Sequence, residues 1–395
     1  MNETLRSHLN RFQSAGLVIG IIGLALCAVG AFVDADRFFP AYLFGYLFWL
    51  GLTLGCFGVA MIHYLTGGRW GDLTRRFLEA GFMTLPLMAV LFVPIFFGLN
   101  HLYPWARPAE VAASKILQNK APYMNFGAFT GRMVFYFVVM SVMAWLLRKW
   151  SLEQDQTSDV EPTRRMRMLS GPGIIIYPLT ASFAYIDWVM SLEPDWYSTV
   201  FGVIICAGQV LLAFTFVTLL LAWFKNYEPF SQYNTRAPFH QLGNLILSFV
   251  VFWTYVSFGQ LLIIWSGNLP HEISWYLHRI GGSWKWIIGF LAAFHFFFPF
   301  FLLLFRTMKR HVRALSFLAA MVFVAHIVDA FWLVTPTFHP TGIRVNWIDF
   351  AALLGVGGAW VAMFIAMLKR APLLARNDPR MHYPAPAQLA TAHGQ

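Results

Sequence analysis

Ten stretches of about 20 mostly apolar residues follow one another along the chain, and each is long enough to cross a bilayer as an α-helix. The expected spans are 13–33, 38–65, 77–100, 127–148, 172–191, 198–224, 241–266, 285–305, 313–335 and 348–369. Charged residues make up only 12% of the chain, whereas a soluble domain carries roughly 25%. The alternating pattern of membrane β-strands is absent. The sequence therefore predicts an all-α, polytopic membrane protein.

The distribution of basic residues predicts the orientation of these spans. If the chain crosses at every span, 20 of its 28 Lys and Arg fall on the side of both termini. Basic residues are enriched in cytoplasmic segments, so we expect both termini in the cytoplasm, as in a bacterial inner membrane protein. No cleavage signal follows the first span, and we expect it to be retained. The formal charge of +10 is spread over several segments and does not indicate a nucleic-acid partner.

The cysteine pattern argues against a redox centre carried by this chain. Cys27, Cys56 and Cys206 all fall inside expected spans, and no CxxC or CxxCH motif occurs. Iron–sulfur clusters and c-type haem need such thiols. A phosphate-binding loop and a dinucleotide fingerprint are also absent, which disfavours an ATP-driven pump. We therefore expect no cofactor bound by this chain alone.

Ionisable residues at membrane depth are costly and often mark proton or ion routes. His326 and Asp329 lie three residues apart in the ninth span, so they share one helix face. Together they can hold or pass a proton, although a structural hydrogen-bonded pair is the simpler interpretation. His295, in the antiparallel eighth span, is expected at a similar depth. A bis-histidine haem between His295 and His326 is a minor alternative.

Further candidates for a proton route lie on both sides of this pair. Asp187 lies near the outer end of the fifth span and is followed by Glu193 and Asp195, which predicts an acidic mouth on the outer surface. His63 and Glu79 are expected toward the cytoplasmic side. These residues outline two half-routes that meet at His326 and Asp329.

The seventh span carries a polar stripe of Thr254, Tyr255, Ser257 and Gln260. Such side chains can relay protons through water. Helix bridging is the simpler role for each of them individually.

Three segments carry a resemblance to a known family: MIHYLTGGRWG at 61–71, YIDWVMSLEPDWYSTVFGV at 185–203 and FWTYVSFGQLLIIWSGNLPHE at 252–272. With the ten-span layout, the chain resembles the NrfD-like membrane subunits of the polysulfide-reductase family, and within it the ActF subunits of alternative complex III. Tyr64 is a departure, because the family pattern places a second histidine beside His63.

The resemblance implies two four-helix bundles, formed by spans two to five (about 38–191) and six to nine (about 198–335). Spans one and ten lie outside them, and 370–395 forms a cytoplasmic tail. It implies a subunit without its own redox centre in a quinol:electron-acceptor oxidoreductase of a respiratory or photosynthetic chain. Expected partners are an ActC-like quinol-binding membrane subunit, an iron–sulfur subunit, and multihaem and monohaem cytochrome c subunits. A terminal oxidase is a further candidate. The iron–sulfur clusters and haem c belong to those partners.

Two other functions remain open from the sequence. The first is direct quinone binding, with Asp187, His101 and Asp349 as candidate residues near the outer surface. The second is a stand-alone secondary transporter, in which Pro86, Pro94 and Pro299 break helices near the membrane midplane.

Overall fold

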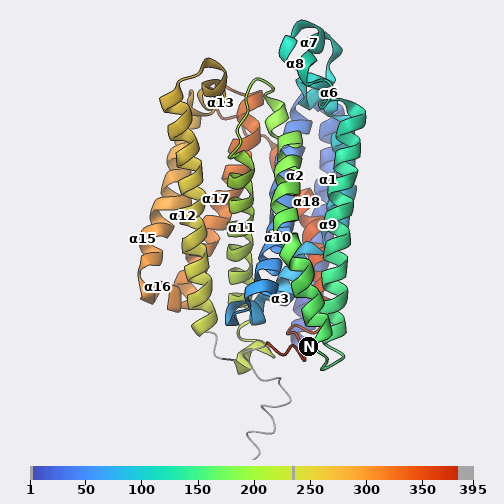
Figure 1. Ribbon diagram of the computed structural model, residues 1–395, viewed down its shortest axis with the longest axis vertical. Helices are drawn as coiled ribbons and strands as arrows, with labels where there is room; N and C mark the ends of the chain where they lie inside the picture. Colours follow the sequence, from blue (N-terminus) through green and yellow to red (C-terminus); the bar gives the residue numbers. More distant parts are fainter. Residues whose placement is uncertain (1–2, 234–235, 381–395) are drawn as a thin grey trace, which may run out of the picture.

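The computed structural model describes residues 3–233 and 236–380, with the side chain of His271 left out. All regular structure in this part of the chain is helical, and ten segments are long and apolar enough to cross a membrane (Figure 1). They are α1 (Glu3–Val33), α2 (Ala35–Thr66), α3 to α5 (Arg69–Phe97), α9 (Phe126–Gln154), α10 with η2 (Glu161–Leu192), α11 (Phe201–Phe224), α12 (Arg236–Gly267), α14 to α15 (Trp284–Leu304), α17 (Val312–Phe338) and α18 (Trp347–Lys369). The predicted fold class is confirmed.

Two of the ten spans are interrupted where the sequence places proline. The third span divides into α3 (Arg69–Phe82), α4 (Leu85–Leu91) and α5 (Val93–Phe97), and Pro86 and Pro94 open the last two. The eighth span comprises α14 (Trp284–Leu291), a π-helical turn at Ala292–Phe297 and α15 (Phe298–Leu304). Proline removes a backbone donor and clashes with the preceding turn, which explains the breaks in the third span.

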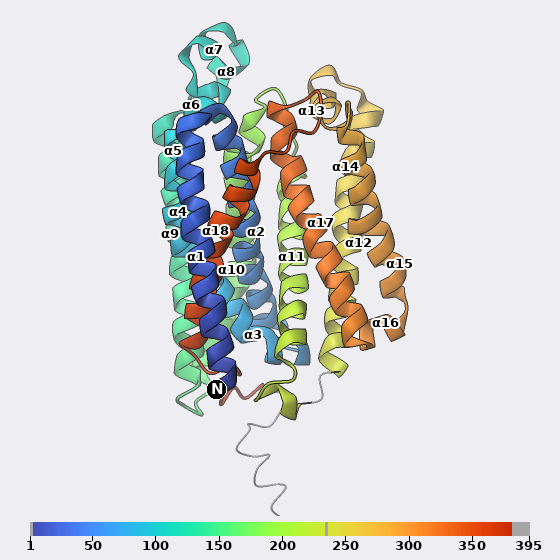
Figure 2. The same cartoon turned by 180° about the vertical axis from the view of Figure 1, so that it is seen from behind.

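Shorter helices cover the two ends of the bundle. They are α6 (Leu99–Leu102), η1 (Pro104–Ala106), α7 (Pro108–Ala113), α8 (Lys115–Lys120), η2 (Met190–Leu192), η3 (Phe230–Gln232), α13 (Pro270–Ile280) and α16 (Arg306–Arg310). The helix α13 lies in the connection between the seventh and eighth spans. Figures 1 and 2 place α7, α8 and α13 at the end opposite to the N-terminus. We call these the far end and the terminal end.

The described part of the C-terminal segment also lies at the terminal end. The Lys369 amine donates to Asn10 of α1, at 2.7 Å. The expected tail at 370–395 is described only as far as Arg380, so 381–395 lies outside the described residues. An even number of crossings, which leaves both ends on one side, agrees with this placement.

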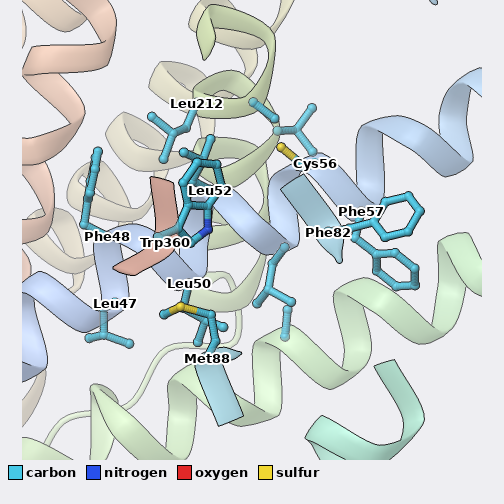
Figure 3. Close-up of a cluster of buried hydrophobic side chains, with 14 of the residues drawn as sticks. Leu47, Phe48, Leu50, Leu52, Cys56, Phe57, Phe82, Met88, Leu212 and Trp360 are labelled. Atoms are coloured by element: carbon cyan, nitrogen blue, oxygen red, sulfur yellow. The ribbon is translucent and has the colours of Figure 1, made fainter. Parts of the chain in front are cut away.

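The long helices pack as two groups that meet along α2 and α11. One group contains α2, α3 to α5, α9 and α10, and the other contains α11, α12, α14, α15 and α17 (Figure 2). At the junction the backbones touch, because a Cβ on Gly55 of α2 would lie 1.9 Å from the Gln209 carbonyl oxygen of α11. Figure 3 shows the apolar core around α2, where Leu212 of α11, Met88 of α4 and Trp360 of α18 gather.

The helices α1 and α18 lie outside these two groups and pack against each other through glycine. A Cβ on Gly20 would lie 2.7 Å from the Ala359 nitrogen, and one on Gly358 would lie 2.3 Å from the Gly20 nitrogen. Small residues permit this close backbone contact between membrane helices. The contact holds α1, which otherwise has many exposed apolar side chains, against the rest of the protein.

Replacing Gly20 with leucine is therefore expected to separate α1 from α18 and to lower stability by about 1–3 kcal/mol, as overpacking does. Thermal unfolding of the purified protein, followed by size-exclusion chromatography, measures the effect. Ile21→Leu is the control, since Ile21 is 61% exposed beside the same contact. Equal unfolding midpoints for the two variants would show that the glycine contact is dispensable.

Candidate functional site

A histidine pair lies at the centre of the second helix group. His295 Nε2 and His326 Nδ1 are 3.0 Å apart, and both side chains are buried. His295 sits in the π-helical turn, a geometry that is frequent at functional sites. His326 packs against Gly208 of α11, where a Cβ would approach its ring to 2.9 Å. The expected similar depth of the two histidines is thus observed, and they contact each other directly with no group between them.

Asp329 lies one turn from His326 on α17, and both line a cavity of about 920 Å³. The cavity wall is mostly apolar and comes from α11, α12, α13, α14, the π-helical turn and α17, with additional residues from α2, α10 and α15. No side chain of the described residues forms a hydrogen bond or ion pair with Asp329. The direct Asp329–His326 pair that the spacing allowed is therefore not formed, because His326 bonds to His295 instead.

The polar stripe of α12 forms one side of the same cavity. Gln260 is buried, accepts a hydrogen bond from Ser198 at 2.5 Å and donates to the Tyr276 hydroxyl at 3.0 Å. It thus bridges three segments, which is the simpler of the two predicted roles. Thr254 and Ser257 line the cavity, and their hydroxyls have no partner among the described residues. Tyr255 is 74% exposed, so it lies at the rim of the cavity.

Glu79 lies outside this cavity, in a buried ion network at the terminal end. Its Oε1 accepts from Tyr64, Ser151 and Arg75, and its Oε2 accepts from Arg76 and Arg148. Both carboxylate oxygens are therefore saturated with donors. This arrangement favours a structural role for Glu79 over proton transfer.

The described C-terminal residues complete this network. Asp378 binds Arg75 at 2.5 Å, and Arg76 pairs with Asp155. Burial alone would raise the pKa of the Asp378 carboxyl, but Arg75, Arg380 and a backbone donor outweigh it and hold that pKa below its ordinary value. The described part of the expected tail, 370–380, is thus fastened to α3.

His63 lies next to this network on α2. Its Nε2 is 4.0 Å from an Asp72 oxygen, its ring packs against Trp70, and its Nδ1 has no partner within the described chain. Tyr64, which replaces the expected second histidine, binds Glu79. His63 and Glu79 are thus near one another, as the half-route predicted, but neither lines the cavity that holds His326.

Asp187 is held by Arg132 of α9. The guanidinium donates to both carboxylate oxygens, at 2.8 and 3.0 Å, and the Tyr136 hydroxyl donates at 2.9 Å. Asp187 is only 1% exposed. It is therefore a buried, paired carboxylate of the first helix group and not part of an open acidic mouth.

Glu193, a second carboxylate of the expected acidic mouth, is also neutralised. Glu193 binds Arg279 at 2.6 Å, His278 at 3.1 Å and Thr337 at 2.7 Å. These contacts tie the turn after α10 to α13 and α17. Burial lowers the pKa of the Arg279 guanidinium, and Glu193 offsets this only in part. Glu193 is therefore an ion-paired residue and not a free carboxylate of an acidic mouth, because its partners come from distant segments.

The three residues proposed for direct quinone binding do not line one cavity within the described structure. His101 pairs with Asp36 at 2.6 Å and stacks on Phe39. Asp349 caps α18 together with Asn346. Neither residue forms a hydrogen bond or ion pair with Asp187, which pairs with Arg132.

Sequence reasoning missed the arginines that complete these clusters. Arg132, Arg148 and Arg279 entered the sequence analysis only in the count of basic residues, yet each neutralises a carboxylate. That these arginines pair with carboxylates could have been predicted, since arginine and carboxylate residues near membrane depth are expected to pair. Which carboxylate each arginine binds could not be predicted, because the pairs join segments far apart in the sequence.

The fold and this cavity define the chain as a multi-pass helical membrane protein with a polar cluster inside its second helix group. No protein-family model matches the chain, and no curated protein shows significant similarity to it.

Proposed function

We propose that this chain is a membrane subunit of a quinol-oxidising electron-transport complex of the alternative complex III type, in which it provides a proton route. The route runs through the second helix group, with Asp329, His326 and His295 as its central residues. In this proposal the chain carries no redox centre, and its partners supply the iron–sulfur clusters and haem c. Both termini face the cytoplasm.

The observation that carries the proposal is the unpaired Asp329 carboxylate beside a hydrogen-bonded histidine pair. Unpaired ionisable groups in membrane spans are expensive and are usually functional. The buried carboxylates of Glu79 and Asp187 are neutralised by arginine. Asp329 is not, so it can take up and release a proton without breaking an ion pair. The adjacent imidazoles can accept that proton through the shared cavity.

We infer from the polar residues near the cavity where the two ends of the proton route meet water. Gln260, Ser198 and Tyr276 lead from the cavity toward α13 at the far end. In this proposal these residues form the exit in place of Asp187, because Asp187 pairs with Arg132. On the terminal side, His63 remains a candidate for proton entry, whereas Glu79 serves the ion network.

The double variant Asp329→Asn with His326→Ala is expected to abolish proton translocation while quinol oxidation continues. The measurement is the proton-to-electron ratio of the purified complex in liposomes. Val324→Leu is the control, because that side chain is 52% exposed on the same helix as Asp329 and does not line the cavity, so the ratio should be unchanged. An unchanged ratio in the double variant would refute the route.

The transporter alternative is favoured by the broken third and eighth spans. Purification from the native membrane separates the two ideas. Co-isolation with multihaem and iron–sulfur subunits supports the redox complex, whereas a homogeneous preparation of this chain alone supports a transporter.

A further inference from the structure

The link between the eighth and ninth spans carries a cluster of cations without counter-charges. Residues 306–313 read RTMKRHVR and include Arg306, Lys309, Arg310 and Arg313. All 18 Asp and Glu of the chain lie in the part that the structure describes, and none of them forms an ion pair with these four side chains. This differs from the first helix group, where the buried arginines bind carboxylates. We call residues 306–313 the basic link.

The cations of the basic link gather at one place in the fold. The helix α16 lies at the terminal end, at the edge of the second helix group (Figures 1 and 2). Arg306, Lys309 and Arg310 all act electrostatically on the imidazole of His240 in α12, and no carboxylate contributes to the charge at that ring. The groove between α16 and α12 is therefore positive and lacks a compensating group among the described residues.

Lys309 is the most buried cation of the basic link. Its side chain is 8% exposed, and a Cβ on Gly243 of α12 would lie 2.7 Å from its Cγ. The absence of a side chain at Gly243 thus lets the aliphatic part of Lys309 lie directly against α12. The Lys309 ammonium has neither a hydrogen bond nor an ion pair among the described residues. Because a buried charge without a partner is unfavourable, a bound anion would stabilise this arrangement.

The start of α17 adds to the positive charge of the basic link. His311 is the N-cap residue of α17, but its side chain accepts no capping hydrogen bond from the first turn. The N–H groups of an uncapped first turn and the helix dipole both favour an anion. Phosphate groups are common ligands of such helix ends. The cations and the helix end therefore favour the same kind of ligand.

Exposed apolar side chains continue from the basic link toward the middle of the bundle. Phe301, Leu304 and Phe305 are 55%, 54% and 60% exposed, and Phe317 of α17 is 68% exposed. Phe301 and Leu304 belong to the eighth span and Phe317 to the ninth, both of which can cross a membrane. Exposed apolar residues of such spans face lipid. A ligand that has both a phosphate group and hydrocarbon chains matches both surfaces.

We propose that the basic link binds the headgroup of an anionic phospholipid. The phosphodiester oxygens accept hydrogen bonds from Arg306, Lys309 and Arg310, and the acyl chains lie along α15 and α17. A free phosphate ion shares the headgroup chemistry, but it would leave the apolar side chains beside the link unused. This site is separate from the cavity that holds Asp329, and the inference holds whether or not the chain carries protons.

The test titrates the purified full chain in non-ionic detergent and counts bound molecules by native mass spectrometry. The probes are phosphatidylglycerol, phosphatidylcholine with the same acyl chains, and inorganic phosphate. We expect saturable binding of phosphatidylglycerol, about tenfold tighter than that of phosphatidylcholine, with no displacement by an equal concentration of phosphate. Equal affinities for the two lipids would overturn the proposal. Displacement by phosphate would also overturn it, because the site would then take a free anion.

Two matched double variants connect this binding to the basic link. Arg306→Gln with Arg310→Gln removes two exposed cations, so folding is not threatened, and it is expected to weaken phosphatidylglycerol binding about tenfold. Arg6→Gln with Arg11→Gln removes the same charge from exposed positions of α1 and should leave binding unchanged. Arg306→Lys with Arg310→Lys keeps the charge and should retain binding. Equal affinities in the two glutamine variants would overturn the proposal, because the lipid would then respond to the overall charge of the protein.

Discussion

Replacing Glu79 with glutamine is expected to destabilise the protein more than any other single change considered for it. Glu79 is fully buried, and its carboxylate is bound by three guanidinium groups, from Arg75, Arg76 and Arg148. Glutamine has almost the same shape but leaves these cations without their shared counter-charge. Breaking a buried ion pair by removing one partner costs about 3–5 kcal/mol. We expect a thermal unfolding midpoint lowered by on the order of 10 °C.

The matched control is Glu153→Gln. Glu153 belongs to α9 at the same end of the molecule, and its contact with Arg165 is long, at 3.8 Å, and about half exposed. Exposed pairs contribute about 0–1 kcal/mol, so the control should unfold near the wild-type temperature. If the two variants unfolded at the same temperature, the terminal-end network would not hold the bundle together. A Glu79→Gln protein that was as stable as the wild type but had lost proton translocation would show that Glu79 belongs to the proton route.

The second large effect is expected for Asp187→Asn. This change keeps the volume of the side chain but removes the charge that Arg132 and Tyr136 surround. Because the Arg132 side chain is 20% exposed, water compensates in part, and we expect a loss of about 2–3 kcal/mol, below the range for fully buried pairs. Thermal unfolding of the purified protein measures this loss.

A double-variant comparison distinguishes an ion pair from a functional carboxylate at position 187. Adding Arg132→Gln to Asp187→Asn removes the unpaired cation, so the double variant should be more stable than Asp187→Asn alone. Tyr136→Phe serves as the control that removes only one hydrogen bond. Asp187→Asn and Arg132→Gln are also measured singly. A loss of stability in the double variant equal to the sum of these two losses would show that Asp187 and Arg132 are not coupled.

Membrane architecture was predictable because it depends on local properties of the sequence. A run of about 20 apolar residues needs no partner to be recognised as a span, and its backbone satisfies its own hydrogen bonds as a helix. All ten spans were predicted in this way. The ends were less accurate: α1 begins at Glu3, not near residue 13, because polar residues extend the helix beyond the apolar run.

The residues of the candidate site were only partly predictable. The sequence alone determined that His295, His326 and Asp329 lie at membrane depth, since depth follows from position within a span. Only the tertiary structure decided that His326 bonds to His295, that Asp329 faces a cavity without a partner, and that Arg132 and three other arginines neutralise Asp187 and Glu79. The physical reason is that an ionisable group is defined by the charges around it, and in this fold those charges come from helices distant in the sequence.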